Sequence, residues 1–272
     1  MNTEMKVRTK FKLALISAFL LMGAGCMQQQ QVVAPGVYPE PDTGFFGRRL
    51  QARLPQEKAD VAFIFIGGFA EQVLTHFRSV YESTPVLPVQ GKQVRACYAW
   101  DGGRGCLLFH STRLIRDDIN AFLKLNPGAD LVFVGHSYGG SAVMDVVRQI
   151  KGEHGKIIAV TLDAVSCRDR SRPRERAEGV DYWVNVYCRP YRHPKDVAAM
   201  VGGQWQECPQ ADENLCFSGE ERDTKGRRYQ HARPDALFTD THPARATSAH
   251  LLMLDACKRL NVGTETKQQV HE

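Results

Sequence analysis

The chain has 272 residues, of which 43% are hydrophobic and 24% are charged, and its formal net charge is +5. This length is sufficient for one sizeable core, since a single α/β domain needs roughly 200 residues. Four cations within the first twelve residues, against Glu4, leave +2 for the rest of the chain, which gives no electrostatic reason to expect nucleic acid. No phosphate-binding glycine loop and no zinc-type spacing of cysteine and histidine occurs in the sequence, so no nucleotide or metal cofactor is expected.

The first 25 residues have the composition of a signal peptide. A basic stretch precedes a short apolar run at 13–22, which is too short for a membrane-spanning helix of about 20 residues. Small residues directly before Cys26 resemble the processing site of bacterial lipoproteins, and this resemblance implies a lipid on Cys26 and attachment to a membrane. Gly23 departs from the pattern, because that family usually has leucine there. Secretion with an unmodified Cys26 is the alternative, and both alternatives predict export to the cell envelope.

Residues 26–58 form a polar, proline-containing stretch without helix or strand periodicity, which predicts an extended tether with one edge strand near 49–54. The catalytic domain is expected at 59–262, followed by a polar tail at 263–272. Within the domain, buried apolar runs alternate with amphipathic segments, which predicts an α/β fold with a mostly parallel sheet and helices on both faces. The expected strands are 61–66, 94–100, 131–134, 156–162 and 182–187, and the expected helices are 71–81, 115–123, 138–150 and 251–260.

The most informative stretch is 129–150, where a buried strand breaks at a glycine and an apolar helix follows. Between them lies the G-x-S-x-G spacing at 135–139, and a turn this sharp needs glycines because the strand and helix backbones pass close to the serine. The stretch resembles the nucleophile elbow of the α/β-hydrolase superfamily. The resemblance implies an α/β-hydrolase fold with Ser137 as the catalytic nucleophile.

A serine nucleophile needs a base and a carboxylate, in the superfamily's order Ser, Asp or Glu, His. Asp163 ends the strand that follows the elbow helix, and it is the expected acid. This position resembles that of the acid in pancreatic-lipase-like enzymes. Asp196 is the reserve, and a structural turn at Asp163 is the alternative. His250 is the expected base, because it directly precedes an apolar helix, as in the superfamily.

Two other histidines, His242 and His231, remain alternatives for the base, and His250 could instead be a polar helix cap. His136, inside the elbow, occupies a position where the superfamily uses varied residues structurally. The oxyanion hole is expected from the main-chain N–H groups of Tyr138 and of Phe69, which follows two glycines after the first strand.

Residues 189–249 are polar and rich in proline, which predicts an irregular lobe above the site with one short strand near 236–239. Export favours disulfides among the eight cysteines. Cys257 is expected to be a buried thiol on the apolar face of the last helix, together with Leu251 and Leu254. The preferred pairs are Cys97 with Cys106, Cys208 with Cys216, and Cys167 with Cys188.

These features predict a serine hydrolase that cleaves carboxylic esters, esterase-like or lipase-like, through an acyl-enzyme on Ser137. The expected partners are a small-molecule or lipid ester and, through Cys26, a membrane. The same residues would also serve a thioesterase or an acyltransferase. An alternative from a different class is a non-catalytic envelope lipoprotein with the same fold.

Overall fold

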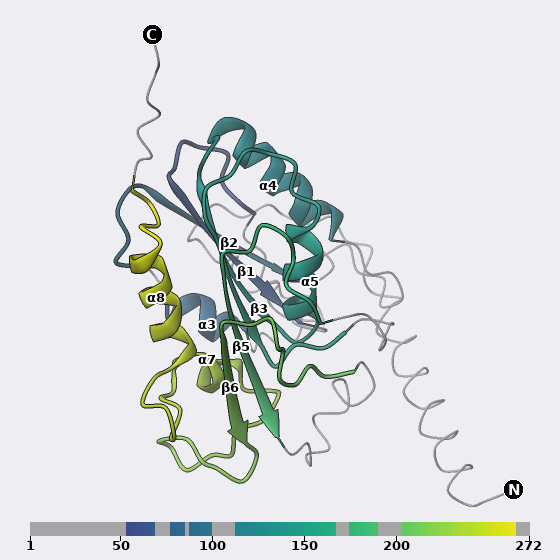
Figure 1. The fold of residues 1–272 in the computed structure, drawn as a ribbon, viewed down its shortest axis with the longest axis vertical. Helices are drawn as coiled ribbons and strands as arrows, with labels where there is room; N and C mark the ends of the chain where they lie inside the picture. The colour runs from purple at the N-terminus through teal and green to yellow at the C-terminus, as the bar shows by residue number, and fades with distance from the viewer. Residues whose placement is uncertain are drawn as a thin grey trace, which may run out of the picture.

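The computed structural model describes residues 53–68, 77–84, 87–99, 112–166, 174–189 and 203–264. Within these ranges the chain forms an α/β fold around a six-stranded sheet in which every neighbouring pair is parallel (Figure 1). The strand order is β2-β1-β3-β4-β5-β6. The strands are β1 (Val61–Gly67), β2 (Gln93–Ala99), β3 (Asp130–His136), β4 (Ile157–Leu162), β5 (Tyr182–Arg189) and β6 (Glu213–Ser218).

The central strands are apolar on both faces because helices cover both sides of the sheet. In β1 every residue is buried, and successive side chains point to opposite faces. Phe63 and Phe65 belong to one core cluster, whereas Ile64 and Ile66 belong to the other. One continuous apolar strand therefore contributes side chains to both core clusters, one on each face of the sheet.

Two helices cover one face, namely α4 (Arg113–Leu125) and α5 (Tyr138–Val147). The apolar side chains of α4 recur at helical spacing, and Ile115, Ile119 and Phe122 are fully buried against the sheet. These two helices and the sheet enclose the first core.

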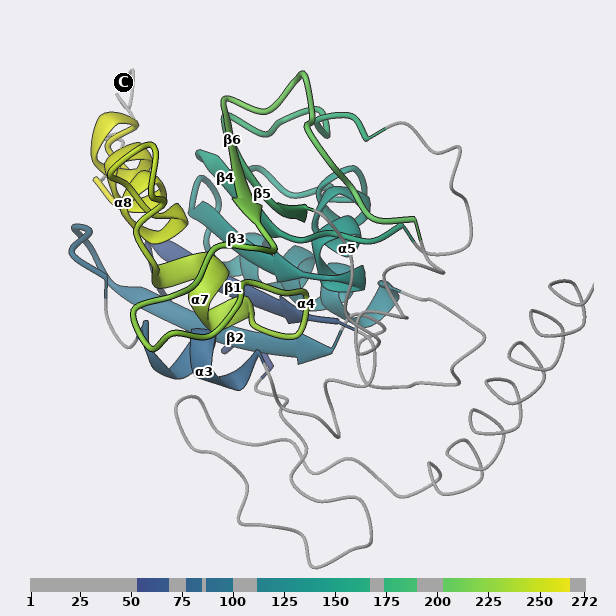
Figure 2. The same cartoon turned by 90° about the horizontal axis from the view of Figure 1, so that it is seen from below.

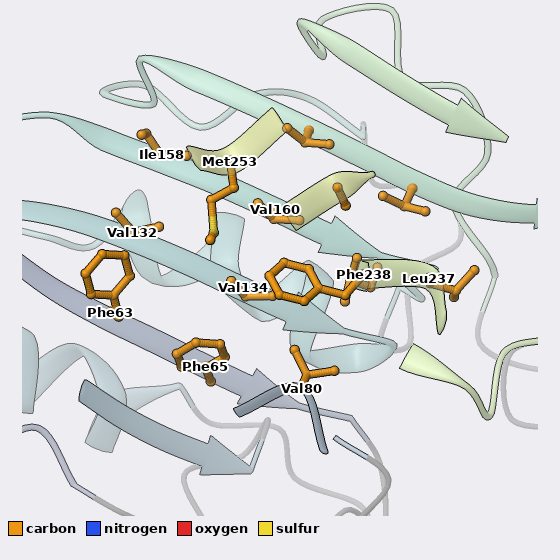
Figure 3. Close-up of a cluster of buried hydrophobic side chains, with 14 of the residues drawn as sticks. Phe63, Phe65, Val80, Val132, Val134, Ile158, Val160, Leu237, Phe238 and Met253 are labelled. Atoms are coloured by element: carbon orange, nitrogen blue, oxygen red, sulfur yellow. The ribbon is translucent and has the colours of Figure 1, made fainter. Parts of the chain in front are cut away.

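Three helices cover the opposite face, as the two views in Figures 1 and 2 show. They are α3 (Arg78–Glu82), α7 (Pro234–Thr239) and α8 (Ala249–Arg259). In Figure 3, Leu237 and Phe238 of α7 and Met253 of α8 lie over the valines of the central strands, and all three side chains are completely buried. Helices α7 and α8 thus both contribute side chains to the core.

Most predicted elements are confirmed to within one or two residues at their ends. The prediction of a strand near 236–239 is wrong, because this segment is helix α7 with Pro234 in its first turn. Strand β6, which extends the parallel sheet at one edge, was not predicted from the sequence. Of the expected edge strand at 49–54, only Arg53 and Leu54 are described, and neither lies in a strand.

The leader, Cys26 and most of the tether lie outside the described residues, as do Phe69 and Asp196. None of the helices in the described ranges has the length and hydrophobicity that a bilayer crossing requires.

The expected disulfide between Cys208 and Cys216 is not formed. The Asn214 side chain closes this loop instead, by hydrogen bonds of 3.0 Å to both the N–H and the carbonyl of Cys208. The Cys216 thiol forms a hydrogen bond with the hydroxyl of Tyr187, the residue beside it on β5. The other two predicted pairs each include a cysteine outside the described residues, Cys106 or Cys167.

Cys257 is buried in the core with 2% of its surface exposed, so its assignment as a core thiol is confirmed. Burial raises the pKa of this thiol to about 12. The grouping with Leu251 is wrong, because that side chain is 51% exposed on the other side of α8.

Candidate active site

Ser137 lies at the turn between β3 and α5. Its backbone angles are φ 57° and ψ −128°, a conformation that residues with a Cβ atom rarely adopt. The turn is tied to the next strand, since the Ser137 N–H donates to the Leu162 carbonyl at 3.0 Å. The strained turn lifts the side chain from the carboxyl end of the central strand.

The glycines around Ser137 are required by close backbone contacts. A Cβ atom at Gly139 would overlap the carbonyl oxygen of Ile66 on β1, and one at Gly135 would lie 2.5 Å from the carbonyl oxygen of Gly139. A Cβ at Gly68 would lie 2.5 Å from the Cβ of Ser137. The spacing of the motif thus has a steric cause, as the sequence analysis expected.

Asp163 follows β4, the strand beside β3, and its side chain is completely buried. Its Oδ2 lies 2.7 Å from His231 Nδ1, and its Oδ1 accepts from Cys188 N–H at 3.0 Å and from Gln204 Nε2 at 2.5 Å. Burial alone would raise the pKa of Asp163, but the hydrogen bonds from these three donors outweigh it and keep the pKa below its ordinary value. The carboxyl group is therefore ionised at neutral pH.

His231 connects this carboxylate to the serine. Its Nε2 lies 2.8 Å from Ser137 Oγ. Because an ionised carboxylate only accepts, Nδ1 carries the hydrogen that is donated to Asp163, and in the neutral ring Nε2 is left to accept the hydrogen of the serine hydroxyl. This tautomer can take a proton from Ser137 and share the resulting positive charge with Asp163.

A second histidine, His136, contacts His231. His136 Nε2 donates to the main-chain carbonyl oxygen of His231 at 2.8 Å, and the two ring centroids are 4.8 Å apart. On its other side the His136 ring stacks on Phe77, at 6.0 Å. His136, directly before Ser137, thus holds the main chain of His231, the histidine that Ser137 contacts.

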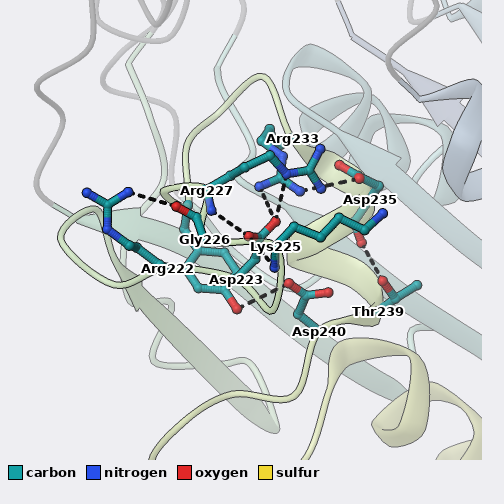
Figure 4. Close-up of polar contacts among 10 residues, drawn as sticks. Arg222, Asp223, Lys225, Gly226, Arg227, Arg233, Asp235, Thr239 and Asp240 are labelled. Atoms are coloured by element: carbon teal, nitrogen blue, oxygen red, sulfur yellow. Dashed lines mark hydrogen bonds and ion pairs between the residues drawn. The ribbon is translucent and has the colours of Figure 1, made fainter.

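The loop that carries His231 is held by a buried carboxylate, Asp223 (Figure 4). Asp223 accepts from the N–H and the guanidinium of Arg227, at 2.6 and 3.0 Å, and pairs with Arg233 at 2.6 Å. Burial opposes ionisation of Asp223, but the main-chain N–H of Arg227 and the guanidinium groups of Arg233 and Arg227 keep its pKa well below the usual range. Because Arg233 lies two residues after His231, this ion pair fixes the end of the histidine loop.

The choice of His250 as the base is corrected to His231. The His250 ring packs on Phe238 with centroids 5.1 Å apart, and its Nε2 is buried without a hydrogen-bond partner among the described residues. His242 is engaged elsewhere, since its Nε2 donates to the Cys216 carbonyl at 2.8 Å. Ser137 and Asp163, in contrast, are brought together as predicted, through His231.

One sequence signal could have identified His231. The rule that favoured His250, a histidine directly before an apolar helix, also points in a looser form to His231, which lies three residues before the first residue of α7. Proline is favoured at the first position of a helix, and Pro234 stands there. The signal was hidden because residues 236–239, most of α7, were predicted as a strand.

Of the two expected oxyanion donors, Tyr138 is the first residue of α5, so its N–H belongs to the positive end of the helix dipole. Phe69 lies outside the described residues, although Gly68 directly before it lies against Ser137. Within the ranges that the structure describes, no group of three or more histidine, cysteine or carboxylate side chains is arranged to hold a metal ion. No family model matches the sequence, and no curated protein is similar enough to it to count as a match.

Proposed function

We propose that this protein is a serine hydrolase of the α/β-hydrolase superfamily that cleaves carboxylic esters, as esterases and lipases do. The observation that carries the proposal is the unbroken line of hydrogen bonds from Ser137 Oγ through the His231 ring to Asp163, with lengths of 2.8 and 2.7 Å. The strained elbow and the buried, ionised carboxylate support it, because each is costly and each serves this chemistry.

In the proposed reaction, Ser137 Oγ attacks the acyl carbonyl while its proton moves to His231 Nε2. Asp163 stabilises the imidazolium ion that forms. The developing oxyanion is stabilised by the N–H of Tyr138 and, as the superfamily resemblance implies, by that of Phe69. His231 then returns the proton to the leaving alcohol, and water releases the acyl group by the reverse sequence of proton transfers. No step needs a cofactor.

The cellular setting is proposed from the sequence alone. The leader at 1–25 supports export, and the small residues before Cys26 support a lipid anchor in the cell envelope. An anchored enzyme of this class would meet its ester substrate close to a membrane surface.

Hydrolysis of nitrophenyl esters of graded chain length tests the proposal. Ser137→Ala and His231→Gln should each lower kcat by about 10⁴-fold while the protein stays folded, because the members of a triad act as a unit. His250→Gln is the matched control and should keep kcat within about twofold, since its ring packs on Phe238 and its Nε2 has no hydrogen-bond partner among the described residues.

Two results would count against the proposal. If the wild type hydrolyses none of these esters, the non-catalytic alternative gains support. If His231→Gln retains wild-type turnover, the base lies elsewhere.

A further inference from the structure

Asp163 has a second oxygen, Oδ1, that does not contact His231. It accepts from the Cys188 N–H at the end of β5 and from Gln204 Nε2, at 3.0 and 2.5 Å. The same amide nitrogen also donates to the Cys188 carbonyl, at 3.0 Å. Gln204 therefore joins the carboxylate to the neighbouring strand and fixes the direction in which the carboxylate points.

Gln204 is itself held firmly in place. Its segment pairs in antiparallel fashion with the segment after Asp163, through hydrogen bonds from Ser166 N–H to Gly203 and from Trp205 N–H to Ala164, at 3.0 and 2.7 Å. The Trp205 indole also donates to the Ser166 hydroxyl at 2.8 Å. These contacts fix the main chain on both sides of Gln204, so its side chain extends toward Asp163 from a fixed position.

We propose that Gln204 is a positioning residue of the active site, which sets the rotation of the Asp163 carboxylate so that Oδ2 faces His231 Nδ1. This inference rests on the proposed function. The amide is neutral and acts only as a donor to Asp163, so it stabilises the ionised carboxylate without competing with His231 for the proton. It also contributes to the lowered pKa of Asp163.

The test compares Gln204→Met with Gln206→Met. Both residues are glutamines of the same segment, but Gln206 is exposed and its side chain accepts from Arg189 instead of contacting the site. Gln204→Met should lower kcat by roughly tenfold with KM little changed, since a hydrogen bond to a charged group is lost. The acidic limb of kcat/KM should move to higher pH, because the Asp163–His231 pair, without the donor, binds a proton more readily. Gln206→Met should change neither.

A second measurement does not depend on turnover. Titration of ¹⁵N-labelled histidine by NMR follows proton binding to the Asp163–His231 pair, through the signal that is lost in His231→Gln. The midpoint of this titration should move to higher pH in Gln204→Met, because the carboxylate loses a donor, and should stay constant in Gln206→Met. A folded Gln204→Met with the pH profile, kcat and titration midpoint of the wild type would overturn the inference. Absence of ester hydrolysis in the wild type would instead contradict the proposed function, and the NMR titration would still test Gln204.

If Gln204→Met does not fold, Gln204→Glu decides the question. Its side chain is a donor only while it is protonated, so the ratio of its kcat to that of the wild type should fall as the pH rises. A ratio that stays constant with pH would show that donation to Asp163 is unimportant.

Discussion

At the scale of single residues, Ser137 holds an unfavourable backbone conformation, with φ 57° and ψ −128°. Such a conformation costs about 1–3 kcal/mol for a residue with a Cβ atom, whereas glycine adopts it readily. We expect Ser137→Gly to be more stable than Ser137→Ala by about 1 kcal/mol in urea unfolding.

Ser141 provides the control for this prediction. It lies inside α5 with helical neighbours, so Ser141→Gly should be less stable than Ser141→Ala by about 1 kcal/mol. If glycine and alanine ranked in the same order at both positions, Ser137 would not store strain.

His250 gives a prediction about pH. Burial lowers the pKa of its imidazole, so the folded protein favours the neutral ring. An unfolded histidine titrates near pH 6.5, and stability is therefore lost as the pH falls below that value, because protons bind preferentially to the unfolded chain. His250→Phe keeps an aromatic ring against Phe238. It loses no hydrogen bond at Nε2, because this atom has no partner among the described residues.

Urea unfolding at pH 7.5 and at pH 5 measures this effect. The variant should lose less stability than the wild type between the two pH values. Equal losses would mean that the His250 pKa is the same in the folded and unfolded chains.

At the scale of elements, the loop between β6 and α7 is fixed by the ion pair of Asp223 with Arg233, whose side chains are 2% and 10% exposed (Figure 4). Arg233→Met should lower both Tm and kcat, because a carboxylate is left buried with fewer donors and the His231 loop loosens. Thermal unfolding and ester hydrolysis measure the two effects.

The double variant with Asp223→Asn and Arg233→Met separates the pair from its parts. It should recover part of the lost Tm, because the buried negative charge is removed along with its partner. If the double variant lost as much Tm as Asp223→Asn and Arg233→Met lose together, Asp223 and Arg233 would not be energetically coupled.

The elements also show what sequence reasoning can and cannot reach. Strands such as β1 and β3 were predictable, because an unbroken apolar run of this length is typical of a strand that is buried on both faces of a parallel sheet. The edge strand β6 has only alternate buried residues, and α7 has only six residues, so neither produces a strong periodic signal.

The candidate site divides in the same way. Ser137 and Asp163 follow from local patterns, a motif and a strand end. His231 lies 94 positions after Ser137, and the contact between them depends on how a polar loop folds back over the sheet. The role of Gln204 could not be predicted from the sequence, because a single glutamine in an irregular stretch belongs to no recognisable motif.

At the scale of the whole molecule, the strand order explains why these residues meet. Because β3 and β4 are neighbours and parallel, their carboxyl ends carry Ser137 and Asp163 to the same edge of the sheet. The next strand, β5, brings the Cys188 N–H to Asp163. The sheet thus positions Ser137 and Asp163, and the loop before α7 positions His231 between them.

The proposed lipid anchor is tested on the full chain expressed in an exporting bacterial host. The wild type should sediment with the membrane fraction, and Cys26→Ser should remain in the soluble envelope fraction or accumulate unprocessed. A Cys26→Ser protein that is processed and sediments like the wild type would contradict lipidation at this residue.

The most direct test of the central claim is the reaction of the protein with a fluorophosphonate probe, with the modified residue located by mass spectrometry. The account predicts a single adduct on Ser137, no adduct in Ser137→Ala, labelling at least about 100-fold slower in His231→Gln, and unchanged labelling in His250→Gln. A wild type that is not labelled, or a His231→Gln variant that is labelled as fast as the wild type, would contradict it.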